Sequence, residues 1–173
     1  NYRNKGLNDA ENAELPPMKI LLDAAKHTDI ENLVIDTTNN TVLLNDDEMS
    51  IDVGAIAKGY AAECVADYLK KKGIDGYLLN IGGNVKAIGN RADGTGWKVG
   101  IENPDRTSDK EYIKYLEISN MSLVTSGNYQ RFYNVNGVNY HHLIDPDTLM
   151  PGEKYDSVSV LCEDSGIADA LST

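Results

Sequence analysis

The sequence predicts an α+β fold with a mixed, largely antiparallel sheet and few helices. Many short β-prone runs follow one another, only a few segments carry a helical period, and the two kinds of segment alternate in no regular order. With 173 residues, of which 41% are hydrophobic and 25% charged, we expect a single globular domain over 1–173. Because the chain opens at Asn1 without a methionine and stops at Thr173 just after a helical start, we expect this domain to be truncated at both the N-terminus and the C-terminus.

Two segments have the spacing of amphipathic helices. Residues 1–15 show little periodicity and are expected to be a mobile lead-in or the stump of a missing element. After two prolines, apolar residues at 18, 21, 22 and 25 predict a helix over Met18–His27. A longer helix is predicted from Ile56 to Gly73, because apolar side chains recur at helical spacing in two adjacent rows. We expect both rows to face the core, with a buried thiol at Cys64; they consist of Ile56, Tyr60, Cys64 and Tyr68, and of Ala57, Ala61, Val65 and Leu69.

The predicted strands are short and are separated by turn residues. Two β-prone runs joined by Thr37-Thr38-Asn39-Asn40 predict a hairpin, and the Gly82-Gly83 pair separates two further runs. The expected strands are Leu33–Asp36, Thr41–Leu44, Tyr77–Ile81, Val85–Ile88, Trp97–Ile101, Tyr112–Ile118, Ser122–Thr125, Tyr129–Val135 and Val158–Leu161.

Net charge and cysteine spacing exclude several classes of function. A formal net charge of -11 repels nucleic acids over most of the surface. No apolar run approaches the ~20 residues that are needed to span a bilayer. Cys64 and Cys162 lie far apart and have neither a CxxC spacing nor a Cys/His cluster around them, which excludes zinc and thioredoxin-type sites.

Polar and glycine-rich clusters at the ends of predicted elements are the candidate functional sites. Asp52-Val53-Gly54-Ala55-Ile56-Ala57-Lys58-Gly59 leads into the long helix, where backbone amides favour anions and Lys58 can reach a phosphate; alternatively, Asp52 is only an N-cap. Asn80-Ile81-Gly82-Gly83-Asn84 either brings a ligand close to the backbone or forms a turn. Thr125-Ser126-Gly127-Asn128-Tyr129 is a small polar loop between strands, or a hairpin turn.

Two further clusters carry candidate catalytic and metal-binding groups. In Tyr140-His141-His142-Leu143-Ile144-Asp145-Pro146-Asp147-Thr148, histidines lie beside carboxylates, as in a general base, although a surface histidine would look the same. On a strand, only one of the two adjacent histidines could face a common site. In Ala168-Asp169-Ala170-Leu171-Ser172-Thr173, Asp169 and Thr173 lie one helical turn apart and suit Mg²⁺, unless they form a solvated helix face.

Taken in order, these motifs resemble the ApbE-type FAD:protein FMN transferase family. The match extends from about Leu33 to Thr173 and also includes Trp97-Lys98-Val99-Gly100-Ile101 and Pro151. The resemblance implies a domain related to the T-fold and a transferase that binds FAD and uses Mg²⁺ to split its pyrophosphate. The FMN part would be transferred to a Thr or Ser hydroxyl of an acceptor protein, with release of AMP.

The resemblance also assigns roles to residues of this chain. The catalytic histidine would be His142 rather than His141, with Asp145 near the reaction. The metal ligands would be the backbone carbonyl of Ala55 and the side chains of Asp169 and Thr173, and the FAD-binding residues would be Asp52, Lys58, Gly82 and Gly83.

Two positions depart from the family pattern: Asn128 stands where an acidic residue is usual, and Leu149 stands where glycine is usual. The first puts in doubt any role of that position as a base or metal ligand, and the second changes a turn. Hydrolysis of FAD to FMN and AMP, a non-catalytic FAD-binding domain, and an interaction domain without a small-molecule site are the alternatives. By resemblance, we expect a membrane-associated lipoprotein on the outer face of the bacterial cytoplasmic membrane, anchored outside this sequence, whose acceptor is a different protein.

Overall fold

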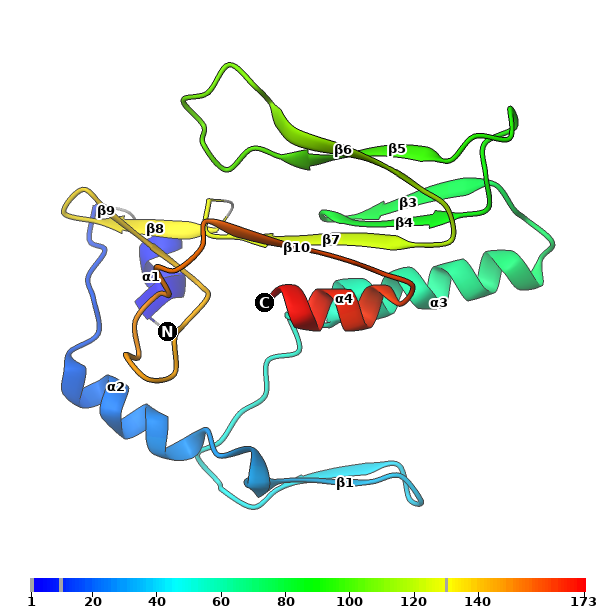
Figure 1. Ribbon diagram of the computed structural model, residues 1–173. Helices are drawn as coiled ribbons and strands as arrows, with labels where there is room; N and C mark the ends of the chain where they lie inside the picture. The colour runs from blue at the N-terminus through cyan, green and yellow to red at the C-terminus, as the bar shows by residue number, and fades with distance from the viewer. Residues whose placement is uncertain (1, 10, 130) are drawn as a thin grey trace. The chain divides into compact units, whose positions relative to one another are not determined.

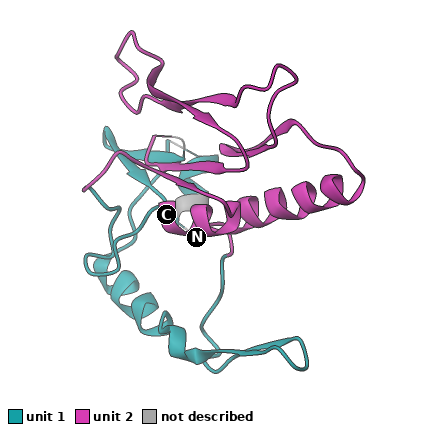
Figure 2. Ribbon diagram, turned by 45° about the vertical axis from the view of Figure 1, so that its right-hand side comes forward, with its two compact units in different colours: residues 1–52, 130–153 teal, residues 53–129, 154–173 magenta. Residues whose placement is uncertain are grey.

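The computed structural model describes residues 2–9, 11–129 and 131–173, which form two compact units. Unit 1 comprises residues 1–52 and 130–153, and unit 2 comprises residues 53–129 and 154–173 (Figure 2). Every strand pairing within the described ranges is antiparallel, which confirms the predicted α+β class with a largely antiparallel sheet. The expectation of a single domain over the whole chain stays a prediction.

Unit 1 is built from short helices and two hairpins. The predicted helix after the prolines is confirmed, and its last residues form a 3₁₀ turn instead of a continued α-helix. The predicted hairpin of β1 and β2 is confirmed with its expected bounds. The elements are α1 (Tyr2–Asn8), α2 (Met18–Ala24), η1 (Ala25–His27), η2 (Ile30–Asn32), β1 (Leu33–Asp36), β2 (Thr41–Leu44), β8 (Phe132–Val135) and β9 (Val138–His141).

Residues 1–15, which were expected to be a mobile lead-in or the stump of a missing element, contain the helix α1. Gly6 lies against the buried ring of Tyr133 on β8, so that a Cβ atom at Gly6 would come within 2.6 Å of the ring carbon Cδ2. The helix therefore packs through a glycine against a strand far away in the sequence. Such a contact leaves no periodic apolar pattern in residues 1–15.

His27 joins η1 to the turn that follows β2. Its Nδ1 atom lies 2.8 Å from Oδ2 of Asp46 and 3.0 Å from Oδ1. This hydrogen bond is the main reason why the pKa of His27 is raised above its usual 6.5. The pKa of Asp46 is lowered from 3.8, first by the backbone N–H of Glu48 and then by His27.

Unit 2 consists of three layers (Figure 1). The middle layer is a four-stranded sheet in the order β10-β7-β4-β3, with α3 and α4 on one face and the β5–β6 hairpin on the other. The elements are α3 (Ala57–Lys71), β3 (Tyr77–Ile81), β4 (Asn84–Ile88), β5 (Trp97–Glu102), β6 (Tyr112–Ile118), β7 (Ser122–Gly127), β10 (Ser157–Cys162) and α4 (Ser165–Ser172). The strands match the predicted runs to within a few residues.

Two predicted strand boundaries need correction. The segment expected to be a polar loop begins inside β7, because residues 125–127 pair with β10. The strand expected over Tyr129–Val135 begins only at Phe132 and is followed by an additional strand, β9, with which it pairs as a hairpin.

The two faces of the sheet in unit 2 differ in chemistry, because neighbouring side chains on a strand point to opposite faces. On one face, Ala87 and Leu123 pack with Val99 and Ile118 of the β5–β6 hairpin to form the apolar core cluster. On the opposite face, polar side chains of β4 and β7 point at the helices. That polar face is where the helices hold the candidate site.

The buried face of α3 is not the predicted one. Tyr60 is 68% exposed and Tyr68 is 61% exposed, and Cys64 is an exposed free cysteine instead of a core thiol. The buried residues of α3 are the small ones, Gly59, Ala62 and Ala66. Small side chains let α3 come close to α4, and the large apolar side chains of the helix therefore point away from this contact.

A buried ion pair holds α3, β4 and the start of α4 together. Lys86 of β4 donates to Oε1 of Glu63 at 2.8 Å and to the carbonyl oxygen of Glu163 at 2.9 Å, and its side chain is only 8% exposed. Oε1 of Glu63 also accepts the backbone N–H of Ser165, the first residue of α4. The ion pair thus places the first turn of α4 against α3.

Candidate functional site

The candidate site of unit 2 lies where α4 contacts the first turn of α3. Asp169 on α4 is fully buried, and its Oδ2 atom accepts the backbone N–H of Gly59 at 2.9 Å. Gly59 is one of the first residues of α3, whose N–H groups have no partner within the helix. Ile56, the N-cap residue, offers no side-chain hydrogen bond, so Asp169 supplies this one from a different helix. The alternatives of a solvated face for Asp169 and of an N-cap role for Asp52 are therefore wrong.

The second partner of Asp169 is the ammonium group of Lys58. Its Nζ atom lies 3.1 Å from Oδ1 and 3.5 Å from Oδ2 of Asp169, and 3.5 Å from the carbonyl oxygen of Gly54. The ammonium thus joins the carboxylate to the segment that precedes α3, next to Ala55. A cation is already held at Asp169, one of the three residues that the resemblance assigns to a metal ion.

Thr173 follows α4 and lies one turn beyond Asp169, as predicted. Its hydroxyl donates to the main-chain carbonyl oxygen of Asp169 at 3.1 Å, and it lies 3.1 Å from the hydroxyl of Ser126 on β7. Ser126 also lies 2.9 Å from the hydroxyl of Ser172. The sequence analysis did not assign a role to Ser126. Its position could have indicated one, because Ser126 lies two residues from the buried Val124 and therefore on the same face of β7.

Gly82 and Gly83 form the two-residue turn of the β3–β4 hairpin, which confirms the turn interpretation. Both residues have positive φ, 58° and 94°, and Ile81 pairs with Asn84 across the turn. A type I′ turn needs positive φ at both positions, which glycine adopts without strain. A Cβ atom at Gly82 would lie 3.4 Å from Cδ of Lys58, so the turn lies alongside the lysine side chain, as predicted. Asp52 belongs to unit 1, and its place beside them stays a prediction.

Unit 2 also contains buried polar side chains without a partner among the described residues, of which Asn84 ends a predicted cluster and Ser165 was missed. The amide of Asn84 and the hydroxyl of Ser165 have no exposed surface and no hydrogen-bond partner within the described chain. Asn84 points to the helix side of β4, since it lies two residues from Lys86. Unpaired buried polar atoms are the usual sites of internal water molecules.

The family departure at Asn128 has a local explanation. Its side-chain amide donates to Oδ1 of Asp156 at 3.0 Å, and its backbone N–H donates to the main-chain oxygen of the same residue. A carboxylate at position 128 could not make the side-chain hydrogen bond and would repel Asp156. The amide therefore fits the acidic neighbour that this chain provides.

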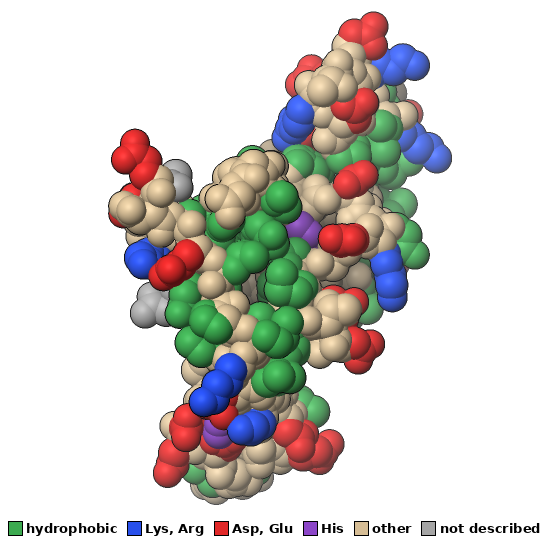
Figure 3. Space-filling model, turned by 90° about the vertical axis from the view of Figure 1, so that its left-hand side faces the viewer, with side chains coloured by type: hydrophobic (Ala, Val, Ile, Leu, Met, Phe, Trp, Pro, Cys, Tyr) green, Lys and Arg blue, Asp and Glu red, His purple; other side chains and the backbone are tan. Residues whose placement is uncertain are grey.

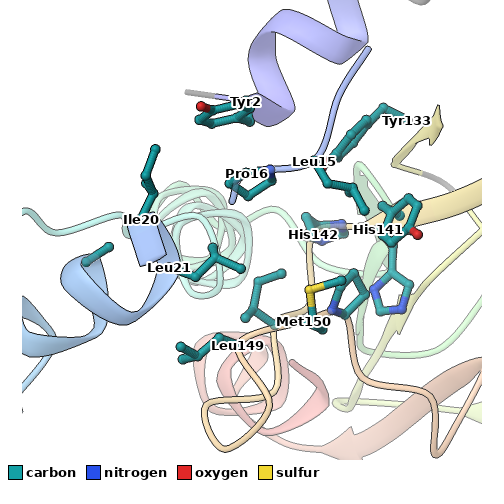
Figure 4. Close-up of a pocket in the computed structure, with 14 residues that line it drawn as sticks. Tyr2, Leu15, Pro16, Ile20, Leu21, Tyr133, His141, His142, Leu149 and Met150 are labelled. Atoms are coloured by element: carbon teal, nitrogen blue, oxygen red, sulfur yellow. The ribbon is translucent and has the colours of Figure 1, made fainter. Parts of the chain in front are cut away.

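In unit 1, an apolar cavity of about 400 Å³ contains the histidine motif. The view in Figure 3 shows hydrophobic side chains gathered around a histidine, and Figure 4 shows His141 and His142 among the residues of the cavity. Both histidines line it, so the expectation that only one can face a common site is wrong. The reason is that β9 ends at His141, and strand alternation does not extend to His142. The remaining lining residues are Tyr2, Leu15, Pro16, Ile20, Leu21, Ala24, Tyr133, Tyr140, Ile144, Leu149, Met150 and Pro151.

The hydrogen bonds of the two histidines differ. His141 Nδ1 accepts the backbone N–H of Leu143 at 3.3 Å, so its Nε2–H donates to the carbonyl oxygen of Gly152 at 2.9 Å. Both nitrogen atoms of His141 thus serve the fold. His142 Nδ1 lies 3.3 Å from the carbonyl oxygen of Arg131, to which it can only donate, and this leaves Nε2 as the unprotonated atom of the neutral ring.

Asp145 builds the turn that follows the histidines. Its Oδ1 atom accepts the backbone N–H groups of Asp147 at 2.8 Å and Thr148 at 3.2 Å. Leu149, in the same turn, has a φ of 58°, which is the left-handed conformation that favours glycine. The turn therefore keeps the glycine-type backbone although a leucine occupies the position, and a catalytic role for Asp145 stays a prediction.

Among residues 2–9, 11–129 and 131–173, no group of three or more His, Cys, Asp and Glu side chains could hold a metal ion. A metal ion at the predicted site would therefore rely on Asp169 with neutral oxygen ligands. In the same ranges, no helix is long and apolar enough to cross a membrane.

Comparison with known proteins connects these features to one family. The model of the ApbE family matches residues 4–173. The FAD:protein FMN transferase from Vibrio cholerae is 38% identical to this chain over 149 residues, which cover 84% of this chain and 43% of that protein. The FAD:protein FMN transferase from Treponema pallidum is 39% identical over 143 residues, which cover 78% of this chain and 39% of that protein. The crystal structure of the ApbE protein from Thermotoga maritima superimposes with a TM-score of 0.85 at 34% identity, covering 95% of this chain and 52% of that chain. For the flavin transferase ApbE from Vibrio cholerae, the TM-score is 0.78 at 34% identity, with 92% and 50% covered. The chain spans about half the length of these proteins or less.

Proposed function

The chain belongs to the ApbE family, and we propose that the protein transfers FMN from FAD to a Thr or Ser hydroxyl of an acceptor protein. The observation that carries this proposal is the match over residues 4–173 to a family whose relatives are named FAD:protein FMN transferase. The reaction forms a bond between the acceptor oxygen and the phosphorus atom on the FMN side of the pyrophosphate. The bond from that phosphorus to the bridging oxygen breaks, and AMP leaves with the bridging oxygen.

In this proposal, Mg²⁺ binds at the oxygen atoms of Asp169, Ala55 and Thr173. The donor set of one carboxylate, one carbonyl and one hydroxyl is of the oxygen type that Mg²⁺ prefers. The fit is supported by Lys58, because its ammonium already holds a positive charge at Asp169 in the way that a bound cation would. A Mg²⁺ ion held by these residues would supply positive charge against the negative charge of the pyrophosphate.

The proton of the acceptor hydroxyl has to be removed during the attack, and His142 is the proposed base. Its Nδ1–H is directed at the carbonyl oxygen of Arg131, which favours the tautomer with an unprotonated Nε2. The imidazole is among the residues that line the cavity of unit 1. Asp52, Lys58 and the Gly82-Gly83 turn are the proposed contacts to FAD, with Lys58 reaching a phosphate.

The test is to incubate the protein with FAD, Mg²⁺ and candidate acceptor proteins and to follow both acceptor mass and nucleotide products. We expect the acceptor to gain the mass of an FMN group together with the release of AMP. The variant His142→Ala should lose transfer while FAD binding is retained. FMN and AMP formed without any acceptor modification would indicate hydrolysis instead, and FAD recovered intact would indicate a binding domain; either result would contradict the proposal.

The cellular location is proposed from the family resemblance alone. We propose that the protein acts at the outer face of the bacterial cytoplasmic membrane, held there by a lipid anchor. Recovery of the native protein in the cytoplasmic fraction without lipid modification would contradict this.

A further inference from the structure

The charge of Asp169 is balanced by a group that a metal ion would have to replace. The carboxylate has no exposed surface, and burying an unpaired charge of this kind is very costly. Its Oδ2 atom is held by the N–H of Gly59, and its Oδ1 atom is held by the ammonium of Lys58 at 3.1 Å. A divalent cation on Oδ1 would lie where the ammonium now lies, and two like charges at such a distance repel strongly.

The two partners of this ion pair differ in freedom of movement. Asp169 is fixed, because it lies on α4 and is completely buried against α3. The Lys58 side chain is 35% exposed, and its stem runs beside the hairpin turn of Gly82 and Gly83. No atom lies within 4 Å of the place where a Cβ atom of Gly83 would be. The lysine can therefore leave the carboxylate along a turn that carries no side chains.

We propose that Lys58 is a placeholder cation, which neutralises Asp169 in the ligand-free protein and moves to the diphosphate of the substrate when a divalent cation binds Asp169. The inference rests on the proposed function, which places a metal ion at Asp169 and a diphosphate ligand beside it. When the metal ion binds alone, it displaces the ammonium of Lys58 from Asp169 and leaves that ammonium without a negatively charged partner. A diphosphate ligand provides a new partner for the ammonium.

It follows that the divalent cation and the diphosphate bind cooperatively through Lys58. Each ligand makes the other bind more tightly, because the first to bind already breaks the ion pair between Lys58 and Asp169. This coupling free energy has to be equal in both directions. Removing the charge of Lys58 should therefore have opposite effects on two measurements. The cation alone should bind more tightly, and the further tightening of cation binding by the diphosphate should become smaller. A lysine that only stabilises the fold would produce neither change.

The experiment measures Mn²⁺ affinity by calorimetry or by electron paramagnetic resonance, without any turnover. ADP-ribose serves as the diphosphate diester, because it carries no FMN group to transfer. Lys58→Met keeps the stem and removes the charge, and Lys70→Met removes an equal charge from the exposed end of the same helix as the matched control. Asp169→Asn reports whether the bound ion is at this carboxylate.

Without ADP-ribose, we expect Lys58→Met to bind Mn²⁺ about 5-fold or more tightly than the wild type, in the range usual for coupled sites. ADP-ribose should tighten Mn²⁺ binding by the same factor in the wild type and in Lys70→Met, but by a clearly smaller factor in Lys58→Met, where only the direct attraction between the diphosphate and Mn²⁺ remains. If Lys58→Met does not fold, Lys58→Gln carries the same test, because its amide can still donate to Asp169.

Unchanged or weaker Mn²⁺ binding by the folded Lys58 variants would overturn the placeholder role. If the wild type still bound Mn²⁺ and Asp169→Asn abolished this binding, the metal site of the proposed function would be supported, and only the placeholder role of Lys58 would be wrong. If neither the wild type nor the Lys58 variants bound Mn²⁺ with ADP-ribose present, the metal site itself would be wrong, and the inference would fall with it.

Discussion

The substitution Gly59→Ala would place a methyl group between α3 and α4, where the structure leaves no space. The new Cβ atom would lie 2.6 Å from the carbonyl carbon of Ser165 and 2.7 Å from Cα of Gly166. Both are main-chain atoms of α4, which cannot rotate away as a side chain could. The carbonyl oxygen of Ser165 would be nearer still, so one helix has to move by more than the 0.8 Å that separates 2.6 Å from an ordinary contact of 3.4 Å.

This movement has a cost in stability that can be estimated. Overpacking of a well-packed contact costs about 1–3 kcal/mol. The same movement would take Oδ2 of Asp169 out of hydrogen-bond range of the N–H of Gly59, and a hydrogen bond to a charged group contributes about 1.5–3 kcal/mol. Alanine returns about 0.5–1 kcal/mol through its better helix propensity. We therefore expect Gly59→Ala to lower the free energy of unfolding by about 2–5 kcal/mol.

The assay is urea unfolding followed by circular dichroism, with Gly166→Ala as the matched control. A Cβ atom at Gly166 would lie 3.1 Å from Oδ1 of Asp164, which caps α4 by accepting the backbone N–H of Ile167, and 3.6 Å from the nearest main-chain atom of Tyr60. The control should cost about 1 kcal/mol or less, because only this cap contact has to shift. If Gly59→Ala were as stable as the wild type, the close contact of α3 and α4 would be wrong, and with it the placement of Asp169.

Three further predictions concern charges and hydrogen bonds. The pKa of His27 is raised above 6.5 and that of Asp46 is lowered below 3.8, so the ion pair stabilises the fold most between pH 3.8 and pH 6.5. The difference in melting temperature between the wild type and His27→Gln should therefore shrink as the pH rises from about 5 to 8. A difference that stayed constant over this range would show that the pair is absent. Lys86→Met should lower the free energy of unfolding in urea by about 3 kcal/mol, because it leaves a glutamate and a carbonyl oxygen without their buried donor; a loss below about 1 kcal/mol would mean that this ion pair is exposed to water. Asn128→Asp should lower stability by about 1 kcal/mol at neutral pH, because a donor becomes a second carboxylate, and the loss should disappear in acid; an equal loss at all pH values would rule out charge repulsion as its cause.

The strands were predictable from the sequence because each has to satisfy a local pattern. The runs over Leu33–Asp36, Thr41–Leu44 and Tyr77–Ile81 have the bounds expected from their β-prone residues and flanking turns. The buried face of α3 was not predictable in this way, since hydrophobic periodicity assumes that the largest apolar side chains point inward. Here the contact with α4 requires Gly59 and leaves Tyr60 exposed, and only the tertiary structure shows that contact.

The candidate site was predictable in its residues but not in its connections. The motifs singled out Lys58, Asp169 and Gly82, and the structure brings these three together in unit 2. The sequence could not show that Lys58 pairs with Asp169, because the two residues are 111 positions apart in the chain. Nor could it show that Ser126 faces the end of α4, since that orientation depends on the pairing register of β7.

Asp169 connects the stability of the fold to the chemistry of the proposed site. A carboxylate that binds and releases a cation has to keep its orientation when the cation is absent, and its charge has to be balanced at that time. Gly59 meets the first requirement through a main-chain N–H that cannot leave, and Lys58 meets the second through a flexible side chain that can. Because these two residues are adjacent at the start of α3, a single helix end provides both a fixed contact and a movable charge. The close contact of α3 with α4 is therefore what allows one buried carboxylate to be part of the fold and still be open to exchange of its cation.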